Sequence, residues 1–151
     1  MQNKHKSLSA YAGARIELYL VAVFTTINLG MIFADSDTVY LFSAFLPYTG
    51  ALFAKAGGVF FLSPVLCAVF LTVVPIAGYY LCAALCTKHI GWMWAGAALY
   101  LIDSIYLAWF VTGPMGGDLR GFVGLILIHA VVLAALIWGA IAGGRMKRAG
   151  I

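Results

Sequence analysis

Four apolar runs, each 19 to 23 residues long, occupy most of this 151-residue chain. The runs are Ile16–Ala34, Pro64–Cys86, Gly91–Val111 and Gly121–Ala142. Because an α-helix rises about 1.5 Å per residue, each run is long enough to cross roughly 30 Å of hydrocarbon. The pattern predicts an all-α membrane protein, a single transmembrane domain with four transmembrane helices.

The overall composition indicates the same class. Hydrophobic residues make up 64% of the chain and charged residues 9%, whereas soluble domains average about 45–50% and about 25%. A soluble fold of this chain would have too little polar surface, and four spans leave no room for a soluble module. The net charge of +4 comes from residues at the ends of the runs, which argues against a nucleic-acid surface.

The basic residues predict the orientation of the helices. Seven of them would lie on one side of a four-span protein: Lys4, Lys6, Arg15, Lys88, Arg145, Lys147 and Arg148. The other side would carry Lys55 and Arg120. Since basic residues are enriched in cytoplasmic loops, this distribution predicts that both termini are cytoplasmic.

A fifth apolar stretch, Tyr40–Ala54, has 15 residues with Pro47 near its middle. As a fifth span it would divide the basic residues five to four and export the Arg145–Arg148 cluster. It is also too short to cross the bilayer easily, so we predict an interfacial or re-entrant helix on the outer side. Ser36 or Asp37 is the expected cap at its start.

Two ionisable residues lie inside predicted spans. Asp103 and His129 are each eight residues from the outer end of their span, which corresponds to a depth of about 12 Å. An isolated Asp at the centre of a span costs roughly 2.5–3.5 kcal/mol, so a mutual hydrogen bond is expected. Asn28, six residues from the outer end of the first span, is a third candidate for this intramembrane polar cluster.

This cluster supports two classes of function. Polar groups between helices fasten membrane bundles, and the sequence favours this interpretation: a non-enzymatic accessory or structural membrane protein. The alternative is a proton-coupled small transporter, or a membrane protein that binds a polar ligand, using Asp103 and His129.

Catalytic and metal-binding signatures are absent from the sequence. There is no nucleophile elbow, zinc-protease motif or phosphate-binding loop, so no catalytic residue and no cofactor are predicted. Cys82, Cys86 and His89 fall at i, i+4 and i+7, a spacing that could begin a metal site. Small packing residues at a helix end explain the two thiols better, and no metal is predicted.

The remaining candidate residues carry charge at the membrane boundary or allow helices to pack closely. Glu17 and Arg15, near the inner end of the first span, point to different helix faces, so Glu17 is expected to pair with Lys88 or Arg145 on neighbouring helices. These residues are interpreted as charges that set topology.

A stripe of small residues, Ala135, Gly139 and Gly143, recurs every four positions on the last span. Such a stripe permits close approach of another helix. Another span of the same chain is the favoured neighbour and a second copy the alternative. The expected partners are the lipid bilayer, a second copy or another membrane protein, and not nucleic acid.

Several short segments carry a resemblance to a known group. They are Arg15-Ile-Glu-Leu, Thr26-Ile-Asn28, the stretch 36–47, Leu101-Ile-Asp103-Ser and Ile128-His129. In these segments the chain resembles a group of small uncharacterised bacterial four-span membrane proteins. The resemblance implies a bacterial cytoplasmic membrane and brings no activity or site residue with it.

Overall fold

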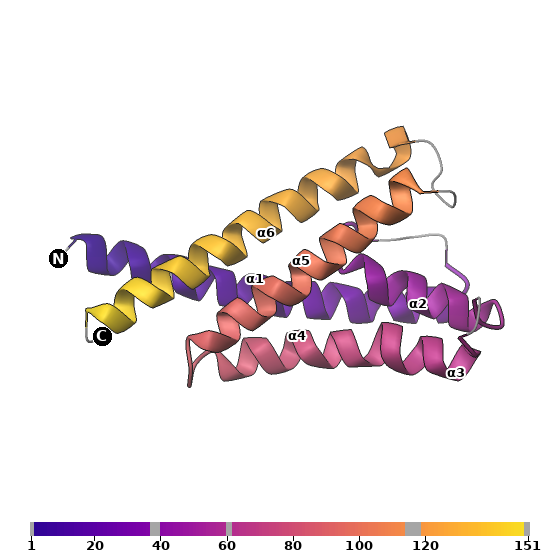
Figure 1. The fold of residues 1–151 in the computed structure, drawn as a ribbon, viewed down its shortest axis with the longest axis horizontal. Coiled ribbons are helices and arrows are strands. Elements are labelled where there is room, and N and C mark those ends of the chain that lie inside the picture. The colour runs from indigo at the N-terminus through magenta and orange to yellow at the C-terminus, as the bar shows by residue number, and fades with distance from the viewer. Residues whose placement is uncertain (1, 37–39, 60–61, 114–118, 150–151) are drawn as a thin grey trace.

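The structure, a computed structural model, describes residues 2–36, 40–59, 62–113 and 119–149. The described part is helical, apart from short connections and one isolated bridge between Val59 and Leu62. In chain order the elements are α1 (Gln2–Phe33), α2 (Phe45–Lys55), α3 (Pro64–Leu66), η1 (Cys67–Val73), α4 (Val74–Leu85), α5 (Gly91–Thr112) and α6 (Leu119–Arg148). Figure 1 shows α3, η1 and α4 as one continuous rod.

Four helices are long and apolar enough to cross a membrane: His5–Phe33, Pro64–Leu85, Gly91–Thr112 and Arg120–Arg148. The prediction of an all-α protein with four helices long and apolar enough to span a membrane is therefore confirmed for the described residues. The first and last helices are longer than the predicted runs, and their extensions lie at the same end of the molecule, where both chain termini are found (Figure 1).

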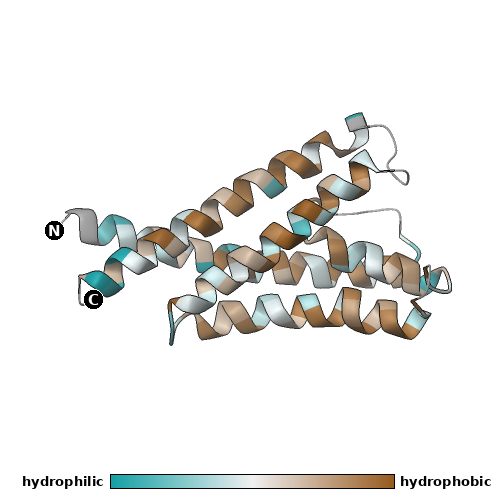
Figure 2. Cartoon of the chain, in the orientation of Figure 1, coloured by the Kyte–Doolittle hydropathy of each residue, from teal (hydrophilic) through white to brown (hydrophobic). Residues whose placement is uncertain are grey.

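The distribution of polar and apolar side chains suits a lipid environment. Large apolar side chains cover the outer faces of the bundle, among them Ile16, Phe33, Val65, Phe70, Ile105 and Val131, each at least 58% exposed. Figure 2 shows apolar residues along the helices and hydrophilic residues near both chain ends. Polar side chains are instead buried, including Thr25, Asn28, Ser43, Thr49, Thr72, Asp103 and His129. Because water would favour the opposite arrangement, the apolar faces are those expected against lipid.

The small-residue stripe of α6 faces α1. A Cβ placed on Gly139 would lie 2.1 Å from the Cβ of Ala14, and one on Gly143 would lie 2.7 Å from the ring of Tyr11. Ala135, on the same stripe, is half-buried. The stripe thus serves contact within the chain, where the absence of side chains lets two backbones approach closely.

The short helix α2 lies between α1, α5 and the π-helical segment η1. A Cβ on Gly50 would lie 2.6 Å from the Cβ of Leu71 and 2.8 Å from Oγ1 of Thr72, so glycine is required for this contact. The Thr72 hydroxyl in turn lies 3.3 Å from the carbonyl oxygen of Pro47. The wide turn of η1 and the glycine of α2 together allow the short helix to pack closely against η1.

Candidate functional site: the polar cluster at the start of α2

Asp103 of α5 caps the first turn of α2. Its Oδ2 accepts a hydrogen bond from the backbone N–H of Phe45 (2.9 Å) and its Oδ1 accepts one from Leu46 (2.7 Å). The first N–H groups of a helix have no partner within the helix, and Ala44, at the N-cap position, offers no side-chain oxygen. The positive end of the helix dipole also favours a carboxylate there. A residue from another span therefore supplies the cap.

His129 of α6 is the third partner of this carboxylate. Its Nε2 lies 3.0 Å from Oδ2 of Asp103, and its Nδ1 lies 3.0 Å from the carbonyl oxygen of Leu125. A carbonyl only accepts, so Nδ1 carries a hydrogen, and a second proton must lie between Nε2 and Oδ2. The pair consequently holds one shared proton and is net neutral, which lowers the cost of burying it within a bilayer.

Asn28 and Thr25 of α1 hold the segment that leads into α2. The Asn28 amide donates to the Tyr40 carbonyl (2.8 Å) and lies 2.7 Å from the Ser43 hydroxyl, while its oxygen accepts from the Tyr40 N–H (2.8 Å). The Thr25 hydroxyl oxygen accepts from the N–H of Ala44 (2.8 Å). Backbone groups that would be costly to bury are thus satisfied by side chains of α1.

The three residues chosen from the sequence therefore lie around one structural feature. Asp103 and His129 are in direct contact, and Asn28 joins them through the chain between Tyr40 and Phe45. The sequence did not predict that the groups at the centre of this cluster belong to the backbone and not to side chains. Thr25 was also missed, although its position three residues before Asn28 places both on one face of α1.

The start of α2 differs from the prediction. The helix begins at Phe45, not near Tyr40, and ends at Lys55. The expected cap from Ser36 or Asp37 is wrong for a helix with this start, because Asp103 takes that place; Asp37 itself lies outside the described residues. A signal was present in the sequence, since proline is favoured in the first turn of a helix and Pro47 marks it.

At its other end α2 is tied to the end of α1. Lys55 donates to the carbonyl of Ile32 (2.9 Å) and forms an ion pair with Asp35. Asp35 has a positive φ of 53°, the left-handed conformation that often ends a helix. Both side chains of this ion pair are exposed, at 42% and 81%. The short helix is thus held to α1 at both ends.

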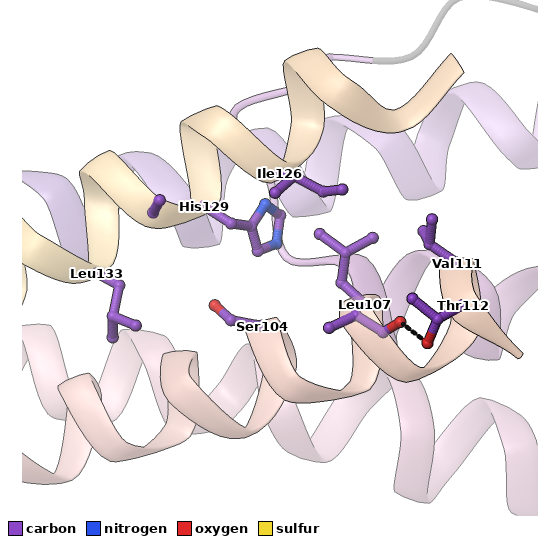
Figure 3. A pocket seen from close by; sticks show the side chains of 9 residues that line it. Ser104, Leu107, Val111, Thr112, Ile126, His129 and Leu133 are labelled. Carbon is purple, nitrogen blue, oxygen red and sulfur yellow. Dashed lines mark hydrogen bonds between the residues drawn. The ribbon is translucent and has the colours of Figure 1, made fainter. Parts of the chain in front are cut away.

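A pocket of about 270 Å³, lined in part by His129, opens between α5 and α6 (Figure 3). Its lining is mainly apolar and includes the exposed residues Ala108 and Ile126. The hydroxyls of Ser104 and Thr112, which also line it, donate to carbonyls of their own helix. The pocket is therefore apolar in character and suits a hydrocarbon chain better than a polar solute.

The end of the bundle that carries the chain termini shows a different arrangement from the one predicted. Arg15 donates through Nε to the carbonyl of Ala83 (3.1 Å), so it helps to satisfy the last turn of α4. The predicted pairing of Glu17 with Lys88 or Arg145 is not among the ion pairs of the described residues.

The cysteines form no metal site in the described part of the chain. Cys67, Cys82 and Cys86 are free and buried, and no group of three candidate metal ligands is present among the described residues. Just beyond its span, the Cys86 thiol donates to the Ala83 carbonyl (3.2 Å), and burial raises the pKa of that thiol. A protonated, hydrogen-bonded thiol fits a packing role.

Comparison with protein-family models, curated proteins and solved structures gives no match. The functional argument therefore depends on the geometry of this cluster. In that geometry Asp103 binds the backbone of α2 and His129 binds the Leu125 carbonyl of its own helix, while one proton is shared between the two buried groups.

Proposed function

We propose that this chain is a non-enzymatic accessory or structural membrane protein whose polar cluster holds α2 as a re-entrant or interfacial helix on the outer side. The observation that carries the proposal is the double cap of α2 by Asp103. A transport site would need polar groups free to meet a solute. Here both carboxylate oxygens and both ring nitrogens of His129 already have partners within the protein.

The basic residues support the placement. With α2 outside, both termini and the Arg145–Arg148 end of α6 lie in the cytoplasm, in agreement with the positive-inside rule. The termini share one end of the molecule and α2 lies at the other (Figure 1), as this topology requires. Together with the resemblance, this favours a bacterial cytoplasmic membrane.

Amide hydrogen exchange in lipid nanodiscs tests the structural role. Asp103→Asn should speed exchange in residues 45–55 selectively, because an amide side chain offers one acceptor where the carboxylate offers two. Ser104→Ala is the matched control, since the Ser104 hydroxyl donates to the carbonyl of Tyr100 in its own helix. Unchanged protection of α2 in Asp103→Asn would refute the role.

Native mass spectrometry of the same nanodiscs tests the accessory class. A protein that acts through a membrane partner or as a homo-oligomer should carry no stoichiometric polar small molecule. A bound solute lost in His129→Gln, with α2 still protected, would instead identify a ligand-binding protein.

One observation favours the alternative of a proton-coupled function. The Asp103–His129 pair holds a proton between two buried groups, and His is the side chain best suited to exchange one near neutral pH. Proteoliposomes with an internal pH indicator would show a proton flux, absent in His129→Gln, if this alternative applies.

A further inference from the structure

The pocket between α5 and α6 follows one stripe of each helix. Its lining residues recur at i, i+3, i+4, i+7 and i+8 on α5, from Ser104 to Thr112, and at i, i+3, i+4 and i+7 on α6, from Ile126 to Leu133. Such spacing places each set on a single helix face. At 1.5 Å per residue the two stripes are about 10–12 Å long. The pocket is therefore elongated along the helices (Figure 3).

The pocket has a buried floor and an exposed rim. Leu107, Val111 and His129 are buried lining residues. Ala108 and Ala130, one on each helix, also line the pocket but are exposed, so it opens at the side of the bundle. The exposed surface of α5 and α6 next to it is made of large apolar side chains, among them Ile105, Leu127 and Val131. Because such faces are those expected against lipid, the pocket opens toward the hydrocarbon of the bilayer.

The polar groups of the lining are already paired within the protein. The hydroxyls of Ser104 and Thr112 donate to carbonyls of their own helix. Both ring nitrogens of His129 have partners, at the Leu125 carbonyl and the Asp103 carboxylate. A ligand that depends on hydrogen bonds would therefore gain little in this pocket, whereas an apolar group would be in contact with apolar walls.

The volume of the pocket limits the kind of apolar occupant. An apolar cavity of about 150 Å³ can hold a benzene ring, and this pocket measures about 270 Å³. A helix from a second copy of the chain, about 10–12 Å across with its side chains, is too wide for it. A single hydrocarbon chain lying along the helices suits both the size and the elongated shape.

We propose that this pocket binds one acyl chain of a membrane phospholipid, from the leaflet next to the Thr112 end of α5. The pocket is about 10–12 Å long, most of the depth of one leaflet, which is half of roughly 30 Å of hydrocarbon. Thr112 is the last residue of α5, and Trp109 beside it is exposed. Since tryptophan is enriched at the level of the headgroups, the headgroup belongs near Thr112 and the chain runs from there toward Ser104.

The proposal requires that the four helices span a bilayer, but it does not depend on the structural role of the polar cluster. Photolabelling in nanodiscs of phosphatidylethanolamine and phosphatidylglycerol tests it. A fraction of the phosphatidylethanolamine carries a diazirine in the middle of one acyl chain. After illumination, mass spectrometry of peptides should locate the label mainly in residues 104–112 and 126–133.

A larger side chain on the rim provides the variant. Ala108→Phe should lower the labelling of both peptides to the level of other lipid-facing segments, because the added ring occupies the pocket. Ala98→Phe is the matched control, since it adds the same ring at another exposed alanine of α5 that does not line the pocket. The control should keep the labelling pattern of the wild type.

Each outcome decides the proposal. Label concentrated at the pocket and lost in Ala108→Phe but not in Ala98→Phe supports it. Label spread evenly over the exposed apolar faces, including those at Ile16 and Phe70, would come from surrounding lipid alone and overturns it. Concentrated label that Ala108→Phe leaves unchanged also overturns it. A dimer in native mass spectrometry that is lost in Ala108→Phe would instead assign the pocket to a second copy.

The folding of the variant can be controlled. Ala108 is exposed, so Ala108→Phe leaves the buried core unchanged. Should it still fail to fold, as judged by circular dichroism, Ala130→Phe adds the ring from the opposite wall and is read in the same way. The distribution of label in the wild type decides between the pocket and surrounding lipid without any variant.

Discussion

At the level of single residues, the two acidic side chains that hold α2 differ in how deeply they are buried. Asp103 is 2% exposed and makes three hydrogen bonds, two of which it accepts from backbone amides. Asp35, at the other end, is 81% exposed in its ion pair with Lys55. Exposed ion pairs contribute about 0–1 kcal/mol, whereas removing a partner from a buried network leaves backbone groups unsatisfied. We therefore expect Asp103 to contribute more than Asp35 to the stability of α2.

Replacing the buried carboxylate tests this difference. Asp103→Asn should lower the free energy of unfolding by about 2 kcal/mol, since a hydrogen bond to a charged group contributes about 1.5–3 kcal/mol. Lys55→Gln should cost less than about 1 kcal/mol. Equilibrium unfolding in mixed micelles measures both, and equal losses in the two variants would contradict the assignment of Asp103 as the principal anchor.

The contact between Asp103 and His129 makes a separate prediction. In a double-mutant cycle, Asp103→Asn and His129→Gln should show a coupling energy of about 1 kcal/mol, in the range measured for hydrogen bonds between membrane helices. Unfolding free energies of the two single variants and the double variant supply the cycle. Additive effects would show that the side chains are not in contact.

At the scale of elements, α2 depends on close approach to η1. Gly50 faces Leu71 and Thr72 at distances that leave no room for a methyl group. Since α2 is 11 residues long, it is too short to be stable alone, and tertiary contacts must supply its stability. The packing of α2 against η1 is therefore as important for its stability as its cap.

Adding a single methyl group tests the packing of α2 against η1. Gly50→Ala should destabilise the protein by about 1–3 kcal/mol, the usual cost of overpacking, and should increase proteolysis near α2. Gly30→Ala is the control, because a Cβ there meets nothing within 4 Å; it should be neutral or stabilising by up to about 1 kcal/mol. A neutral Gly50→Ala would mean that α2 does not pack on η1 as described.

At the scale of the whole molecule, apolar side chains face outward and polar ones inward. Chemical labelling of single cysteines tests the orientation that the charges predict. In a variant without its three native cysteines, Ala149→Cys and Thr87→Cys should resist an impermeant thiol reagent added to intact cells. Ala56→Cys, in an exposed turn after α2, should react. The reverse pattern would overturn cytoplasmic termini.

The sequence predicts features that arise from neighbouring residues better than features that depend on contacts between residues far apart in the chain. The four long apolar helices follow from the length of the apolar runs, a local property, and they are confirmed. The depth of Asp103 and His129 also follows from counting residues along a helix. By contrast, the cap of α2 joins Phe45 to Asp103, 58 positions apart, and the close approach of η1 to α2 joins Leu71 to Gly50. Neither leaves a periodic signal in the sequence.

The distant cap also has a consequence for biogenesis. When Phe45 and Leu46 leave the ribosome, the carboxylate that will accept their N–H groups has not been synthesised. His129, a further 26 positions along the chain, is synthesised later still. The first turn of α2 therefore stays without this cap until the helix that carries Asp103 has been synthesised, although α2 itself is made earlier.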